Sequence, residues 1–198
     1  MKFPIDKQTW QLGLELDRFV EGMQTNHLDM LRRLKTVNLS EPELERFRNS
    51  DRSVHVLVMT EDWCGDSLMN LPILVKIVEA APHFDLRIFL RSGWTELDAY
   101  FRERSITHIP VFMFLDLDFD EIGVWVERSK AASERLAIWV SAHPVYEAIR
   151  TSAELTREEK RSRLAPFQAE RQLEMEEWYQ NGLQSTAVSE IAALFSRI

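Results

Sequence analysis

The segment from residue 54 to residue 142 alternates between strand-like and helix-like hydrophobic patterns, and this alternation limits the possible fold more than any other feature. The run from Val54 to Met59 is apolar and β-branched, which is typical of a strand buried on both faces. The patterns that follow predict helices at 64–80, 96–104 and 131–142, and strands at 86–90, 111–115 and 122–126. Alternating strands and helices imply parallel strands joined by right-handed crossovers, with the last two strands forming an antiparallel hairpin at one edge.

The flanking segments have helical patterns. Before residue 50, apolar residues recur at helical spacing, and a capped helix start is present at Ser40 to Glu43, so this part predicts helices without strands; the first apolar series is Trp10, Leu14, Phe19, Val20 and Met23. After Pro144, a capping-box pattern at Thr156 to Glu159 and a helix end at Gly182 predict further helices. We therefore expect a helical extension at 1–50, an α/β domain at 51–142, and a helical extension at 143–198 packed on that domain.

Charge and length exclude several classes of function. A chain of 198 residues can bury one substantial core. Its net charge of -8 repels nucleic acid and anionic membrane surfaces, because the basic residues do not cluster. The first ten residues lack the apolar stretch of a secretory signal, and no segment approaches the ~20 apolar residues that span a bilayer. We expect a cytoplasmic protein without nucleic-acid or membrane partners.

Cys64 is the only cysteine, so an internal disulfide and a multi-cysteine metal site are excluded, and we expect no metal and no cofactor. It stands where the first strand is expected to pass into a helix. The unpaired amides and dipole at a helix N-terminus favour a thiolate, and hence nucleophilic attack on disulfides. The alternative is a buried structural cysteine.

The residues around Cys64 resemble a known motif. The sequence Trp63-Cys-Gly-Asp-Ser67 resembles the Trp-Cys-Gly-Pro-Cys motif of thioredoxins, Pro72 matches the proline that kinks their active-site helix, and Thr107-His-Ile-Pro110 resembles their cis-proline loop. A closer resemblance is to uncharacterised bacterial thioredoxin-like proteins with Trp-Cys-Gly-Asp-Cys and a tryptophan in the last strand, here Trp125. The resemblance covers about residues 51–140.

This resemblance implies a thioredoxin-like three-layer α/β/α sandwich with a mixed sheet, to which the helical extensions are added. It also implies that Ile109 and Pro110 lie against Cys64, that the Ile109–Pro110 bond is cis, and that this edge binds a peptide substrate. Trp63 is expected at the rim of the site, and Gly65 and Asp66 in the first helical turn, where the Asp66 carboxylate would oppose the thiolate. His108 either supports the thiolate or faces solvent.

Two departures from the motif affect the mechanism. Ser67 replaces the second, resolving cysteine, and Val58 replaces the buried aspartate of thioredoxins. A serine hydroxyl cannot resolve a mixed disulfide, although Ser67 can donate a hydrogen bond to the Cys64 thiolate. We therefore expect thiol-disulfide exchange through a single cysteine, with a protein disulfide or a small thiol as substrate and an external reducing thiol, such as glutathione, to complete the cycle.

Two other functions stay open at this stage. One is a non-catalytic binding module in which the surface around Trp63 and Pro110 holds a partner. The other is a redox sensor in which Cys64 pairs with Cys64 of a second chain or is capped by a small thiol. The oligomeric state is undetermined. The acidic segment Asp116 to Glu127 has a pattern similar to that of a calcium-binding loop. Glu121 stands at the position that requires glycine, so we expect a hairpin turn there instead.

Overall fold

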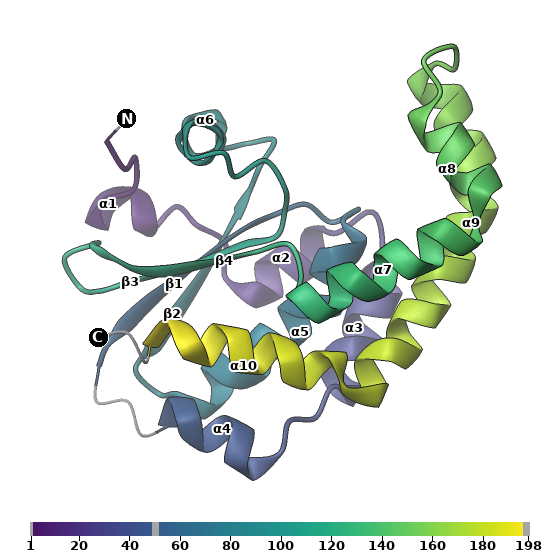
Figure 1. Ribbon diagram of the computed structural model, residues 1–198. Coiled ribbons are helices and arrows are strands. Elements are labelled where there is room, and N and C mark those ends of the chain that lie inside the picture. The colour runs from purple at the N-terminus through teal and green to yellow at the C-terminus, as the bar shows by residue number, and fades with distance from the viewer. Residues whose placement is uncertain (1, 49–51, 196–198) are drawn as a thin grey trace. The chain divides into compact units, whose positions relative to one another are not determined.

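A computed structural model describes residues 2–48 and 52–195 of the chain. Within them, one sheet has the strand order β2-β1-β3-β4 (Figure 1). The strands are β1 (Val54–Thr60), β2 (Phe84–Leu90), β3 (Val111–Leu115) and β4 (Glu121–Val126). Their bounds differ from the predicted ones by two residues at most. The domain boundary predicted at residues 50 and 51 lies outside the described residues.

The sheet is mixed. Strands β1 and β2 are parallel, whereas β3 is antiparallel to β1 and β4 is antiparallel to β3. The expectation of parallel pairing drawn from strand and helix alternation is therefore wrong for β3, and the mixed sheet implied by the resemblance is confirmed. The reason is where β3 begins: Val111 pairs with Met59, so the chain enters β3 at the end where β1 finishes and must run in the opposite direction.

Helices cover both faces of the sheet in the first of two compact units, which comprises residues up to 128 and from 187 onward. One face carries α3 (His27–Thr36), α4 (Glu41–Arg48), α5 (Gly65–Ala80) and the later part of α10 (Gln184–Phe195), and the other carries α1 (Lys7–Trp10) and α6 (Thr95–Glu103) (Figure 1). A further helix, α2 (Leu16–Gly22), precedes α3. These layers confirm the α/β/α sandwich with added helices.

Apolar side chains fill the space on each side of the sheet. Leu57 and Met59 of β1 belong to a buried cluster that includes Trp10 of α1 and Phe101 of α6. On the other side, the ring of Phe195 in α10 contacts rings of three other elements, namely Phe47, Phe84 and Phe114. The alternating direction of side chains along β1 accounts for the two cores.

The N-terminal helices are interrupted at Leu14, where the sequence predicts helical spacing. The backbone of Leu14 instead exchanges two hydrogen bonds of 2.8 Å with Ile88, which adds an antiparallel bridge to the edge of β2. A Cβ atom on Gly13 would lie 2.6 Å from the Phe89 ring, so only glycine permits this close approach. The expectation that this region contains no extended pairing is wrong at this one position, because an edge strand offers unpaired backbone groups.

The second unit comprises residues 129–186 and is helical. It contains α7 (Lys130–Ala142), α8 (Pro144–Thr151), α9 (Arg157–Trp178) and the kinked segment η1 (Tyr179–Leu183), around a core of Trp139, Tyr146 and Leu164. The predicted capping box at Thr156 is present, and Gly182 has a φ of 123° where the helix was expected to end. Among the described residues, no helix is both long and apolar enough to cross a membrane.

A buried arginine compensates for the proline inside α5. Pro72 has no N–H, so the carbonyl of Leu68, one turn earlier, receives no helical hydrogen bond from it. Arg33 of α3 is 3% exposed, and its Nε donates to this carbonyl at 2.9 Å while its Nη2 donates to the carbonyl of Met69 at 3.1 Å. The interruption of α5 is therefore satisfied by protein rather than by water.

Candidate functional site

Cys64 lies between the end of β1 and the first turn of α5. It is the N-cap residue of the helix rather than its first helical residue, and 7% of it is exposed. Its Sγ donates a hydrogen bond to the carbonyl oxygen of Ile109 at 3.4 Å. The Ile109–Pro110 bond is cis, and both residues are buried. The structure thus brings the thiol and the proline loop, 45 residues apart in sequence, into direct contact.

The pKa of the Cys64 thiol is raised above its ordinary value of 9.0, mainly because burial disfavours the charged thiolate. The hydroxyl and the backbone N–H of Ser67 oppose this effect and lower the pKa, and the charge of Asp66 raises it further. The hydrogen bond to Ile109 also favours the neutral thiol, because a thiolate cannot donate. Burial, which has the largest effect on the thiol pKa, is not predicted by the helix terminus or by Asp66.

Ser67 lies in the first turn of α5 and is 1% exposed. Its Oγ is 2.5 Å from the hydroxyl of Thr60 at the end of β1, so one of these two groups donates to the other. Val58, where thioredoxins have a buried aspartate, is fully buried. The nearby carboxylate of Glu61 is also buried, but it accepts the backbone N–H of Ser92 at 2.5 Å and so stabilises the loop after β2.

Asp66 is not an isolated charge beside the thiol. Both of its carboxylate oxygens accept hydrogen bonds from Arg128, at 2.7 Å from Nε and 2.5 Å from Nη2. Arg128 is the second residue after β4, and it was not among the residues predicted from sequence. A topological signal could have identified it: β3 begins beside Cys64 and pairs antiparallel with β4, so the residues after β4 must lie at the same edge of the sheet.

The other predicted site residues occupy the surface around the thiol. Trp63 is 60% exposed, as expected for a residue at the rim. Gly65 begins α5, and an added Cβ atom there would meet no neighbour within 4 Å, so packing does not require glycine. His108 is exposed, and its Nδ1 lies 3.2 Å from the hydroxyl of Thr107. Of the two roles expected for His108, this arrangement favours a side chain that faces solvent over one that supports the thiolate.

The N-terminal helices hold the loop that carries the cysteine. The carboxylate of Asp62 accepts the backbone N–H groups of Gln24 and Thr25 at 2.7 and 2.9 Å, and Asn26 donates to the carbonyl of Asp62 at 2.9 Å. The turn between α2 and α3 is thus fastened to the residues that directly precede Cys64. The segment before the sheet contributes to the site, although it carries no reactive group of its own.

A family model described as thioredoxin matches residues 13–143 of the chain. The chain belongs to the thioredoxin family. The match begins at residue 13, well before the segment of about 51–140 that carries the sequence resemblance, and so includes α2, α3 and α4. Membership supports a thioredoxin-type redox role in general, with thiol-based redox partners.

Two solved structures resemble almost the whole chain. A protein of unknown function from Pseudomonas aeruginosa is 21% identical, covers 94% of both chains and has a TM-score of 0.62. An HIV epitope-scaffold is 20% identical, covers 96% of both chains and also has a TM-score of 0.62. At these identities the likeness concerns the fold. A search of curated proteins finds no match.

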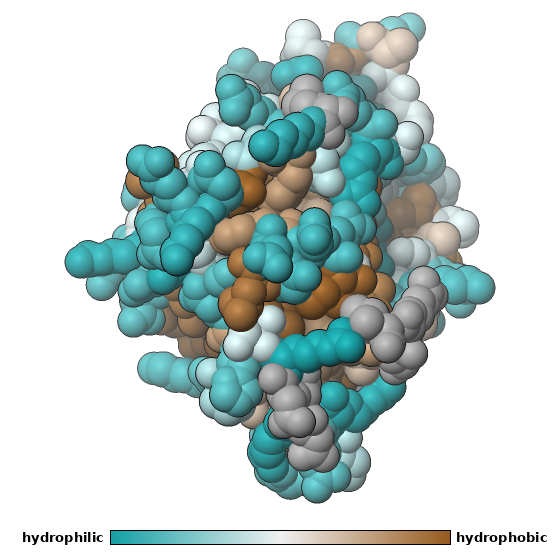
Figure 2. All heavy atoms as spheres, turned by 90° about the vertical axis from the view of Figure 1, so that its left-hand side faces the viewer, coloured by the Kyte–Doolittle hydropathy of each residue, from teal (hydrophilic) through white to brown (hydrophobic). Residues whose placement is uncertain are grey.

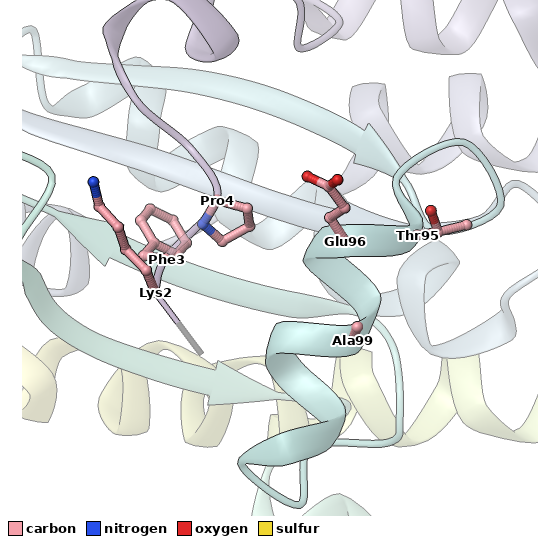
Figure 3. Close-up of a pocket in the computed structure, with 6 residues that line it drawn as sticks. All are labelled: Lys2, Phe3, Pro4, Thr95, Glu96 and Ala99. Carbon is pink, nitrogen blue, oxygen red and sulfur yellow. The ribbon is translucent and has the colours of Figure 1, made fainter.

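One hollow of the thioredoxin-family chain has a volume of about 460 Å³. In Figure 3, Lys2, Phe3 and Pro4 face the first turns of α6 across this hollow. In Figure 2, hydrophilic side chains cover most of the face seen from the left of Figure 1, with hydrophobic residues between them. Such scattered apolar exposure is ordinary for a folded protein and identifies no partner.

The acidic segment between β3 and β4 forms a turn. Oδ1 of Asp116 accepts the backbone N–H groups of Asp118 and Asp120, both at 2.9 Å, so its carboxylate is used to close the hairpin. In the described part of the chain, no group of three or more His, Cys, Asp or Glu side chains could hold a metal ion.

Proposed function

We propose that this protein performs thiol-disulfide exchange through Cys64 alone. The observation that supports the proposal most is the contact between the Cys64 thiol and the Ile109 carbonyl, at the N-terminus of α5 and beside the cis Ile109–Pro110 bond. The exposed ring of Trp63, next in sequence, offers an apolar contact for the substrate. The chain has no second cysteine to resolve a mixed disulfide.

The reaction takes place in two exchanges. Cys64 first loses its proton to solvent, and the thiolate attacks one sulfur of a substrate disulfide, so that a mixed disulfide with Cys64 forms and the other sulfur leaves as a thiolate. An external thiolate, such as glutathione from a cytoplasmic pool, then attacks the substrate sulfur of the mixed disulfide. A disulfide forms between the external thiol and the substrate, and Cys64 leaves as a thiolate. Ionisation of Cys64 also frees the Ile109 carbonyl, which becomes available to accept an N–H of a bound peptide.

Intact-mass measurement tests the proposal. The protein is incubated with oxidised glutathione, and we expect an adduct of one glutathione per chain that persists until dithiothreitol is added. The Cys64→Ser variant, which lacks the thiol, serves as the control. No adduct on the folded wild-type protein, under conditions that modify the unfolded chain, would refute the proposal.

Replacing Ser67 by cysteine sharpens this test. Because the Ser67 hydroxyl and N–H reach the Cys64 sulfur closely enough to affect its pKa, Ser67→Cys should form an internal disulfide under mild oxidant and gain reductase activity toward a protein disulfide. Failure to form that disulfide would mean that residue 67 does not face Cys64.

One observation favours a binding module as the second candidate. Cys64 is buried and its pKa is raised, which slows nucleophilic attack near neutral pH, whereas Trp63 is exposed regardless of the thiol. If binding is the function, Trp63→Ala abolishes the capture of a partner while Cys64→Ser leaves it unchanged. If exchange is the function, Cys64→Ser abolishes the covalent capture and Trp63→Ala only weakens it.

A further inference from the structure

Arg128 forms an ion pair with Asp66, whose charge acts on the Cys64 thiol. The bidentate contact with Asp66 joins residues that are 62 positions apart, and the side chains of Arg128 and Asp66 are only 14% and 16% exposed. Charge-assisted bidentate pairs are among the stronger hydrogen bonds in proteins, and a partly buried pair is screened little by salt. Asp66 is therefore held in a fixed place in the first turn of α5.

The backbone around Arg128 is fastened to both elements that flank Cys64. Glu127 has a φ of 63°, in the left-handed region, and its N–H donates to the carbonyl of Pro110 at 2.7 Å. Asn70 of α5 donates from Nδ2 to the carbonyl of Glu127 at 3.2 Å and to the carbonyl of Asp66 at 2.9 Å. The corner after β4 thus links the proline loop to the start of α5.

Resting on the exchange function proposed above, we propose that Arg128 is a positioning residue of the Cys64 site, which holds Asp66 in an ion pair and fastens the end of β4 to the first turn of α5. Nη2 of Arg128 also contacts Oε1 of Glu127 at 2.6 Å. These three side chains carry a net charge of about -1, and without the arginine they would carry about -2. Arg128 therefore reduces the negative charge that the thiolate meets.

The other charged groups near the thiol have partners or face solvent. Glu61 accepts the N–H of Ser92, and Asp62 accepts N–H groups of the turn between α2 and α3. His108 is exposed and contacts Thr107. None of these contacts involves Arg128, so we expect a change at residue 128 to act on the thiol through Asp66 and Glu127.

A double-variant cycle tests the proposal through the pH profile of Cys64 alkylation by iodoacetamide. Arg128→Gln should slow alkylation at pH 8 by about 3- to 10-fold, and Asp66→Asn should speed it by about 3- to 10-fold, because the charge near the thiolate changes in opposite directions. The double variant should react within about 2-fold of the wild type, since both charges are removed together.

Arg104→Gln is the matched control. Arg104 makes a bidentate pair with Glu121 at the opposite end of β4, at 2.5 and 2.9 Å, so its loss should leave the Cys64 profile unchanged. Arg128→Lys keeps the positive charge but loses the planar guanidinium that makes two hydrogen bonds to Asp66. Its alkylation rate should be closer to that of the wild type than to that of Arg128→Gln. The proposal is overturned if both single variants shift the profile in the same direction, or if Arg128→Gln behaves as Arg104→Gln does.

This outcome is separate from that of the exchange function. Alkylation reports the ionisation and access of Cys64 whether or not the protein exchanges disulfides. A wild-type protein that forms no glutathione adduct, but whose variants follow the cycle, would contradict the exchange function and leave the role of Arg128 in place. If Arg128→Gln does not fold, the double variant is compared with Asp66→Asn. The double variant should react more slowly than Asp66→Asn, because it lacks the positive charge of Arg128, and equal rates would overturn the proposal.

Discussion

The helices α5 and α9 both contain an internal proline, but the carbonyl that the proline leaves unpaired has a different environment in each helix. α5 has 16 residues, ten of them buried, and the carbonyl that Pro72 leaves unpaired is taken by the buried Arg33. α9 has 22 residues, three of them buried, and both Pro166 and Ser162, one turn earlier, are exposed. Water can therefore pair with the Ser162 carbonyl in α9, whereas α5 requires a protein donor.

The two helices also begin differently. The N-terminus of α9 is closed by a capping box between Thr156 and Glu159. The N-terminus of α5 has Cys64 as its N-cap residue with no side-chain cap, and the N–H of Ser67 acts on the thiol. The buried helix α5 is thus supported by Arg33 at its proline and has no side-chain cap at Cys64, where the proposed exchange needs a thiolate.

Arg33→Met should produce the largest effect on stability. The buried carbonyl of Leu68 would lose the donor that replaces the missing proline N–H, and that of Met69 would lose the hydrogen bond from Nη2. We expect a loss of about 2 to 4 kcal/mol in the free energy of unfolding. Arg161→Met on the exposed face of α9 is the control and should cost less than about 0.5 kcal/mol. Urea denaturation measures both, and equal effects would remove the distinction between the helices.

The two prolines should differ in the sign of the effect. Pro166→Ala restores a backbone N–H to the exposed helix α9, but it also raises the conformational entropy of the unfolded chain. The net effect should be a stabilisation by about 1 to 2 kcal/mol. Pro72→Ala should give no gain, because its new N–H competes with Arg33 for the Leu68 carbonyl and the lost ring leaves a cavity. Thermal unfolding of both variants measures this, and a gain at Pro72 would show that Arg33 does not compensate for the proline.

Local patterns predicted most of the fold because they depend on neighbouring residues. The strand at 111–115, the capping box at Thr156 and the helix end at Gly182 are set by side chains within a few positions of one another. The antiparallel direction of β3 could not be read from alternation alone. It depends on the loop after α6 returning the chain to the end of β1, which periodicity does not describe.

Long-range pairs explain what the sequence did not predict about the site. Arg33 with Leu68, Leu14 with Ile88, and Arg128 with Asp66 each join segments more than 30 positions apart, and none has a local signature. The motif identified Cys64 and the proline loop, whose contact the structure displays. The burial of the thiol, which dominates its pKa, depends on packing from several elements and so was not available from the motif.

Substitutions of the two N-cap residues should change the free energy of unfolding less than the arginine and proline substitutions do. Thr156→Ala should cost about 1 kcal/mol, because it removes a capping box. Cys64→Ser should cost nothing or stabilise slightly, because the shorter hydroxyl can cap α5 while the Ile109 carbonyl still accepts a hydrogen bond. A destabilisation by Cys64→Ser as large as that of Thr156→Ala would indicate that Cys64 serves packing rather than chemistry.

The rate of exchange between Cys64 and a small aromatic disulfide, measured from pH 6 to pH 10.5, shows whether the thiol reacts in the folded protein. Since the pKa is raised above 9.0, most of the thiol is protonated near neutral pH, and the rate should rise about tenfold per pH unit and still be rising past pH 9. The same chain unfolded in guanidinium, with an ordinary thiol, should react faster at pH 7.5 and reach its plateau at lower pH. A folded protein that forms no mixed disulfide at any pH, while the unfolded chain reacts, would contradict the account and make Cys64 a structural cysteine.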